Sequence, residues 1–369
     1  MPVASQILLS VLGCGIENTL SEKIEEAEAP EETPPPGPEY VDDIFEQIPT
    51  GEADTLFVID NSGSMYDKQS ALSTNLPAFF SNFESLGVNY HIGVVTTDMT
   101  STTGKGQLQP SYGFPFITPD TQAAIDAQQL VDNDGNALTT EAVFKDMVSV
   151  GTGGSSSEKG LDATYYALNN YQGAGEANES FLRSAADLHV IILSDEEDYS
   201  TEYEPQDVID YLTTLQSQKQ ALFHSIVALS GDSCAYDEGA RYIQVSNTLL
   251  GMTASICSSD WDEMLDELGL EAAGLSREFY LSKTPVVETI EMGIYDENPD
   301  GSGQYDLLYE PTIGEAEYDM VEYIPSTNSL RFKYMNFIPP ANSEVRVHYE
   351  VDTTPADTGA ILDTGDTGP

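Results

Sequence analysis

The chain has 369 residues, 40% of them hydrophobic, which is enough for one large domain or two medium domains with a buried core. Its 63 acidic residues outnumber its 13 Lys and Arg, and the net charge of -50 would repel nucleic acid and anionic membrane surfaces. We therefore expect no nucleic-acid partner. The same charge attracts divalent cations and also suits surroundings of high ionic strength, and composition alone leaves both interpretations open.

The N-terminus has the pattern of an export signal. An apolar run over residues 7–13 ends at Cys14, and Val11-Leu12-Gly13-Cys14 resembles the lipobox of bacterial lipoprotein signal peptides. The run is too short to span a bilayer. We expect residues 1–13 to be a signal peptide and Cys14 to be the lipidated N-terminus of the mature chain. Because the first six residues contain no Lys or Arg, a frayed apolar N-terminus on a soluble protein stays an alternative.

Residues 14–40 are predicted to be an acidic, proline-rich linker. They include the stretch EKIEEAEAPEETPPPGPE, which has almost nothing to bury and should be extended and solvated. Such a tether would hold a folded domain away from a membrane anchor.

Residues 41–274 alternate strand-like apolar runs with segments of helical length, as in an α/β domain. We expect strands at 55–59, 90–96, 188–193, 222–229 and 254–257. Helical patterns cover 67–86, 141–148, 158–170, 205–218, 238–250 and 259–268. Continuous buried runs alternating with amphipathic helices predict a doubly wound, mainly parallel sheet of the Rossmann-like kind, covered on both faces. Residues 97–140 interrupt the pattern and predict an irregular surface excursion.

The helical signal ends near residue 275. Strand-like stretches at 279–281, 286–294, 305–309, 329–334 and 344–351 predict a small antiparallel β module over residues 275–352. The acidic, low-complexity residues 353–369 are predicted to be disordered.

Oxygen-bearing side chains follow two of the predicted strands. Asp60, Ser62 and Ser64 come directly after the first strand in TLFVIDNSGSM, and Ser64 is also placed to cap the next helix. Asp195 follows the strand at 188–193. The carboxyl ends of parallel strands meet at one edge of a sheet, so these groups should converge there. Hard oxygen ligands suit magnesium or calcium, although the first motif alone is equally compatible with a loop that binds nothing.

These segments resemble a von Willebrand factor A-type (VWA) domain with a metal-ion-dependent adhesion site (MIDAS), as in secreted or lipid-anchored bacterial VWA proteins. Asp60, Ser62 and Ser64 match the family's Asp-x-Ser-x-Ser element, and Asp195 in IILSDEED matches its final acid. The family's middle element is a threonine. The loop GTGGSSSEKGL places Ser155 there, with Ser157 as the alternative, and Asp98 in TTDM follows a neighbouring strand as an outer metal residue or, more simply, a loop cap.

The resemblance implies a bound magnesium ion, with calcium or manganese as alternatives, and no catalytic activity. An open coordination position would accept a carboxylate from a protein or other macromolecular partner. Catalytic patterns elsewhere are weak. The Asp-Thr-Gly triplet at Asp357 lies in the polar C-terminal tail, and Ser156 and Lys159 have no companion motif. The four histidines are isolated in sequence.

Cys234 and Cys257 are the two cysteines left if Cys14 is lipidated. Export would allow them to form a disulfide, whereas a cytosolic location would favour two free thiols. We expect a non-catalytic protein of the cell envelope that contacts the membrane only through its lipid anchor. Two other functions stay open: a structural surface protein with a vestigial metal site, and an accessory VWA subunit of a cytosolic ATPase complex.

Overall fold

The computed structural model describes residues 37–100, 104–216, 219–235, 237–298, 303–316, 318–333 and 338–353, and its helices and strands all lie within residues 39–369. The predicted signal peptide, the lipidated Cys14, most of the linker and the acidic tail from residue 354 lie outside the described residues. Within the described ranges, no helix is both long enough and apolar enough to cross a membrane.

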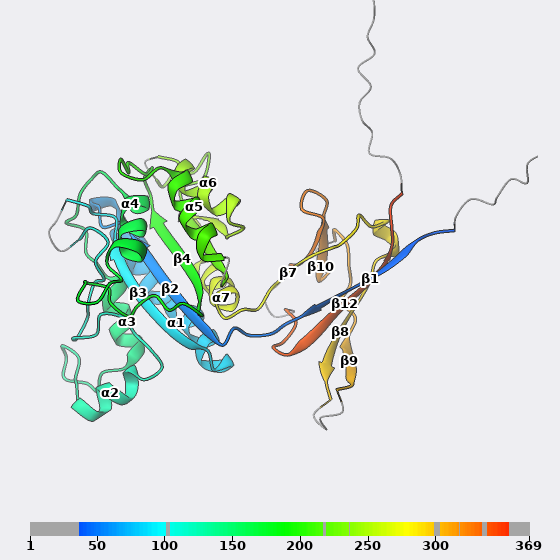
Figure 1. Cartoon of the computed structure of the whole chain (residues 1–369), viewed down its shortest axis with the longest axis horizontal. Coiled ribbons are helices and arrows are strands. Elements are labelled where there is room, and N and C mark those ends of the chain that lie inside the picture. The colour runs from blue at the N-terminus through cyan, green and yellow to red at the C-terminus, as the bar shows by residue number, and fades with distance from the viewer. Residues whose placement is uncertain are drawn as a thin grey trace, which may run out of the picture. The chain divides into compact units, whose positions relative to one another are not determined.

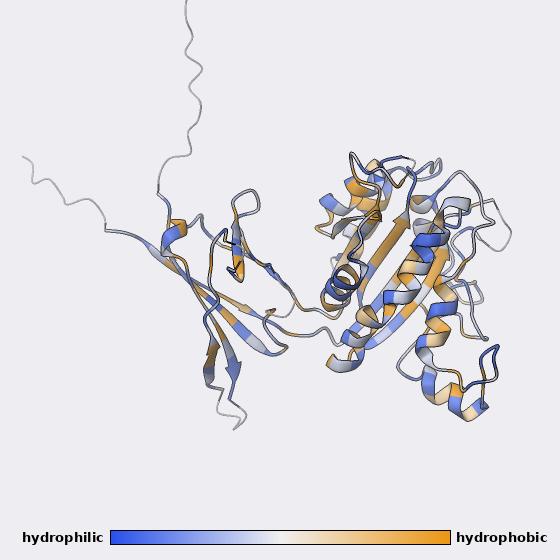
Figure 2. Cartoon of the chain, turned by 180° about the vertical axis from the view of Figure 1, so that it is seen from behind, coloured by the Kyte–Doolittle hydropathy of each residue, from blue (hydrophilic) through white to orange (hydrophobic). Residues whose placement is uncertain are grey.

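Five parallel strands form one sheet, in the order β3-β2-β4-β5-β6 (Figure 1). Their bounds are β2 (Glu52–Ile59), β3 (Asn89–Thr96), β4 (Asp187–Ser194), β5 (Ala221–Val227) and β6 (Thr253–Ser255). Each coincides with a predicted strand to within a few residues. Figure 2 shows hydrophobic residues along these strands, which explains why continuous apolar runs located them.

Helices pack on both faces of this sheet, and alternate strand residues point to opposite faces. Phe57 and Ile59 of β2 pack with α1 (Tyr66–Leu86), α3 (Thr140–Val148) and α7 (Trp261–Ala272). Leu56 and Val58 pack with α4 (Gly160–Tyr165), α5 (Pro205–Gln216) and α6 (Ala240–Thr248), and the π-helical turn η2 (Tyr166–Asn170) extends α4. The segment predicted to be irregular contains a further helix, α2 (Thr121–Gln128).

The remaining strands are antiparallel. One sheet has the order β1-β12-β8-β9, from β1 (Tyr40–Glu46), β12 (Ser343–Glu350), β8 (Glu291–Glu297) and β9 (Tyr305–Tyr309). Another has the order β10-β11-β7, from β10 (Val321–Ile324), β11 (Ser329–Phe332) and β7 (Glu278–Tyr280), with the short helix η3 (Val287–Thr289) nearby in sequence. They share a core that includes Phe279, Ile294, Val345 and Tyr349.

The prediction of a doubly wound, mainly parallel fold is therefore wrong. The described strands form a five-stranded parallel sheet and two antiparallel sheets of four and three strands, which is a mixed α/β arrangement. Part of the error concerns β1, where the sequence predicted no strand and whose residues from 41 onward were included in the α/β domain. Its side chains alternate between exposed and half-buried, and it pairs with β12 over its whole length, from Tyr40 opposite Glu350 to Glu46 opposite Glu344 (Figure 1).

Candidate metal site

The two predicted carboxylates emerge side by side from the parallel sheet. Strands β2 and β4 are adjacent, with Ile59 opposite Leu193, and Asp60 and Asp195 follow them at the carboxyl edge. The backbone N–H of Asp60 donates to the carbonyl oxygen of Leu193 over 2.9 Å, which continues the pairing past the end of the strand. Both aspartates are completely buried.

A chain of short hydrogen bonds joins the Asp-x-Ser-x-Ser motif to Asp195. The backbone N–H of Ser62 donates to Asp60 Oδ1 over 2.7 Å, and the hydroxyls of Ser62 and Ser64 lie 3.0 Å apart. The hydroxyl of Ser64 donates to Asp195 Oδ1 over 2.8 Å. The structure thus brings together four of the five predicted metal ligands, which lie far apart in sequence.

Ser64 does not cap helix α1, contrary to the prediction from sequence. The motif first forms a short 3-10 helix, η1 (Gly63–Met65), and the residue that precedes α1 is Met65, which makes no side-chain cap. The 3-10 turn brings the hydroxyl of Ser64 to Asp195 instead. The Ser64 hydroxyl therefore bonds at the sheet edge and not to a backbone N–H of the helix.

The serine loop approaches the motif through its backbone. The N–H of Gly154 donates to the carbonyl oxygen of Asn61 over 2.9 Å. A Cβ atom at Gly154 would lie 2.1 Å from Asn61 Oδ1, so a larger residue here would force the Asn61 side chain to move. Ser155, the predicted ligand, accepts from the N–H of Ser157 over 3.0 Å and donates to its carbonyl oxygen over 3.4 Å. The hydrogen bonds recorded for these two serines stay within their own loop.

Asp98 lies beyond β3 and is buried. Its Oδ1 accepts hydrogen bonds from the backbone N–H and the hydroxyl of Thr100, over 2.8 and 2.6 Å. This is the geometry of a loop cap.

Sequence reasoning missed Glu158, which it placed inside a helix that in fact begins at Gly160. Glu158 is completely buried, and its Oε2 accepts a hydrogen bond from the hydroxyl of Thr97. Its Oε1 receives no hydrogen bond within the described part of the chain. Burial, and next the negative charge of Asp60, raise the pKa of Glu158 to about 8. An acid inside a Gly/Ser-rich turn was the only signal in the sequence.

Two residues of helix α1 were also missed. Gln69 Nε2 donates to the carbonyl oxygens of Asp60 and Gly151, over 3.0 and 2.9 Å, and so ties the motif to the serine loop. Lys68 Nζ lies 3.4 Å from Asp195 Oδ2 and donates to the carbonyl oxygen of Cys234 over 3.3 Å. Their positions one turn into the helix place both side chains at the sheet edge.

The predicted disulfide is present between Cys234 and Cys257, with their Cα atoms 5.7 Å apart. It joins the loop after β5 to the end of β6. Because the carbonyl oxygen of Cys234 accepts from Lys68, the disulfide loop also contacts the residue that pairs with Asp195.

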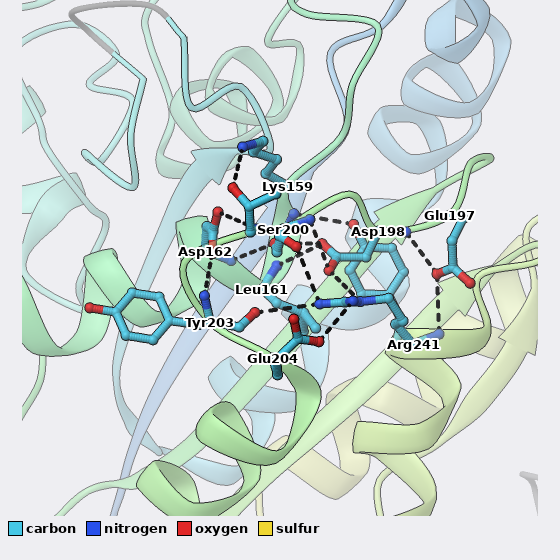
Figure 3. Close-up of polar contacts among 12 residues, drawn as sticks. Lys159, Leu161, Asp162, Glu197, Asp198, Ser200, Tyr203, Glu204 and Arg241 are labelled. Carbon is cyan, nitrogen blue, oxygen red and sulfur yellow. Dashed lines mark hydrogen bonds and ion pairs between the residues drawn. The ribbon is translucent and has the colours of Figure 1, made fainter.

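A buried polar network holds the loop that follows Asp195 (Figure 3). Asp198 Oδ1 accepts from the N–H of Leu161 over 3.2 Å and from the hydroxyl of Ser200 over 2.8 Å, and its Oδ2 lies 3.0 Å from Arg241 Nε. Asp162 accepts from three successive backbone N–H groups, those of Thr201, Glu202 and Tyr203. The network fastens the loop to α4 and α6, so the backbone beside Asp195 is pre-organised.

The electrostatics of the edge favour a cation. Burial raises the pKa of Asp60, hydrogen bonds from Ser194 and Ser62 oppose the rise, and the charge of Asp195 adds to it. Burial, followed by the charges of Asp60 and Asp195, likewise raises the pKa of Glu196. Acids whose pKa is raised by neighbouring negative charge are stabilised as carboxylates when a cation is near.

The donor set fits a hard divalent cation. Carboxylate and hydroxyl oxygens are the ligands that magnesium and calcium prefer. Two buried oxygens that accept no hydrogen bond from the described residues, Asn61 Oδ1 and Glu158 Oε1, lie in the motif and in the serine loop. No group of three or more His, Cys, Asp or Glu side chains in the described ranges forms a metal-binding cluster by itself. At this edge the carboxylates alternate with serine hydroxyls, so a bound ion would be held by Asp60, Ser62, Ser64 and Asp195 together.

Comparison with known proteins identifies no family. Neither a family model nor a curated protein matches the chain. The pilus adhesin SpaC from Lactobacillus rhamnosus GG, in its open conformation, matches with a TM-score of 0.39 and 12% identity, covering 85% of this chain and 41% of the adhesin. Proximal thread matrix protein 1 from the mussel byssus matches with a TM-score of 0.37 and 15% identity, covering 65% of this chain and 51% of that protein.

The chain thus spans about half or less of each of these proteins. Superpositions with TM-scores below 0.5 do not establish a shared fold. The function of the chain must therefore be inferred from its own residues.

Proposed function

We propose that this chain is an exported, lipid-anchored, non-catalytic VWA-type protein that binds a macromolecular partner through a divalent cation. The observation that carries the proposal is the hydrogen-bonded series Asp60, Ser62, Ser64 and Asp195 at the carboxyl edge of β2 and β4. These are four of the five residues that the VWA resemblance assigns to the MIDAS ion, and Ser155 is the fifth. Magnesium is the proposed ion, with calcium and manganese as alternatives.

Each residue has a defined task in this proposal. The hydroxyls of Ser62 and Ser64 would serve a bound ion as neutral ligands. Asp60 is oriented by the N–H of Ser62 and by the hydroxyl of Ser194, which donates to Asp60 Oδ2 over 2.7 Å. Asp195 is oriented by Ser64. With neutral hydroxyls among its ligands, a bound cation would keep enough positive charge to attract a carboxylate of the partner.

The cation site is tested by calorimetric titration of the full chain with magnesium, calcium and manganese. We expect saturable binding by the wild-type protein, weakened about 100-fold in Asp60→Ala, because Asp60 both carries charge and orients the motif. Asp120→Ala is the matched control, since Asp120 is an exposed aspartate beside α2 whose side chain makes no cap. Equal affinities in wild type and Asp60→Ala would exclude the site.

Export and anchoring are supported by the disulfide, which forms in oxidising compartments, and by the lipobox-like sequence before Cys14. When the chain is expressed in a bacterium that processes lipoproteins, we expect it to incorporate labelled fatty acid and Cys14→Ser to incorporate none. Cys234→Ser serves as the control because it also removes one cysteine. Absence of label from the wild-type chain would exclude the anchor.

A further inference from the structure

The loop of residues 151–159 presents two different groups that could act on a cation. The resemblance to VWA domains points to Ser155, but the hydrogen bonds recorded for this side chain are to Ser157 in the same loop, and it is only half-buried. Glu158, three residues later, is completely buried. The two side chains therefore differ sharply in burial.

No donor group of the described residues reaches one of the two carboxyl oxygens of Glu158. The hydroxyl of Thr97 donates to Oε2, and the backbone carbonyl of Glu158 accepts from the N–H of Tyr199 over 2.6 Å, so the residue is firmly positioned. Oε1 accepts no hydrogen bond from the described residues, and the neighbouring side chain of Asp60, through its charge and a carboxyl–carboxyl contact, raises the pKa of Glu158. Buried carboxyl oxygens in proteins are nearly always hydrogen-bonded, paired with a cation or bound to a metal.

We propose that Glu158, and not Ser155, is the group that this loop contributes to the divalent cation, and that it moves the preference of the site from magnesium toward calcium. This inference rests on the proposed cation site. Glu158 adds a third carboxylate to Asp60 and Asp195. Calcium accepts six to eight oxygen ligands in flexible geometry, whereas magnesium usually takes one or two carboxylates and keeps several of its waters.

The test compares Glu158→Gln with Ser155→Ala in the full chain. Glutamine keeps the shape of Glu158 and can still accept from Thr97, but it removes the charge and offers an N–H₂ group to Asp60. We expect calcium affinity, measured by calorimetry, to fall at least about 10-fold in Glu158→Gln and to stay unchanged in Ser155→Ala. The ratio of calcium to magnesium affinity should fall in Glu158→Gln as well.

Thermal unfolding separates this role from a purely structural one. In chelator, Glu158→Gln should be at least as stable as wild type, because glutamine is buried beside Asp60 without the cost of protonating or desolvating a carboxylate. The variant should nevertheless gain less melting temperature than wild type when calcium is added. A variant that is less stable in chelator but gains as much from calcium would show that Glu158 is only structural.

The same titrations distinguish failure of this inference from failure of the cation site. If calcium binds to wild type and to Asp60→Ala alike, the proposed site is wrong. If Asp60→Ala loses binding while Glu158→Gln keeps wild-type affinity and selectivity, or if Ser155→Ala loses binding instead, only the assignment of Glu158 is overturned.

Discussion

Replacing Arg183 by Met should lower the free energy of unfolding by about 3 to 5 kcal/mol, because it leaves the buried Asp54 carboxylate without the guanidinium that pairs with it. Asp54 in β2 is completely buried. Its Oδ2 accepts from the backbone N–H of Arg183 over 2.6 Å, and its Oδ1 lies 2.7 Å from Arg183 Nε. The guanidinium also donates to the carbonyl oxygens of Ala53 and Asn89, both over 2.9 Å, so it joins β2 to β3 at the end opposite the cation site.

The dependence on pH identifies the cause. Burial raises the pKa of Asp54 above 3.8, while hydrogen bonds and the charge of Arg183 lower it. Without Arg183 the folded-state pKa should rise further. In the variant, the folded state then takes up a proton at a higher pH than in wild type. The stability that Arg183→Met loses relative to wild type should therefore return as pH falls from the variant's pKa to that of wild type.

Urea denaturation at several pH values measures this effect. Arg346→Met is the control, because Arg346 pairs with Glu344 and its side chain is 40% exposed, so its loss should cost less than about 1 kcal/mol. Adding Asp54→Asn to Arg183→Met should recover part of the stability at pH 7, since the buried charge is gone. If Arg183→Met alone were as stable as wild type at pH 7, the claim that the buried ion pair stabilises the fold would be contradicted.

Removing the disulfide with the double replacement Cys234→Ser and Cys257→Ser should lower the free energy of unfolding by about 3 kcal/mol. The cysteines are 23 residues apart, and a loop of that size restricts the unfolded chain by this amount in the chain-entropy treatment. We also expect weaker cation binding, because the carbonyl oxygen of Cys234 would no longer be held beside Lys68, the partner of Asp195.

A reductant provides the control for the disulfide. Dithiothreitol should lower the urea midpoint of the wild-type protein to that of the double variant and should leave the double variant unchanged. If wild type and the double variant unfolded at the same urea concentration without reductant, the disulfide would add no stability.

The strands of the parallel sheet could be predicted because burial on both faces requires continuous apolar runs, such as Leu56 to Ile59. Acids placed directly after such runs mark the carboxyl edge, which is why Asp60 and Asp195 could be paired. The fold of the whole chain could not be predicted in the same way. Strand β1 alternates in character and pairs with β12, which lies about 300 residues away, and no local pattern specifies so distant a partner.

Local sequence therefore determined where the motif TLFVIDNSGSM lies and which oxygens it offers. Tertiary structure alone decided what surrounds them. Ser64, which the sequence predicted to cap a helix, donates to Asp195 instead. The serine loop also contains a buried glutamate, Glu158, directly after its serines. Burial, charge repulsion and buried oxygens without a donor arise only when distant segments pack together. They cannot be predicted from the spacing of residues in the sequence.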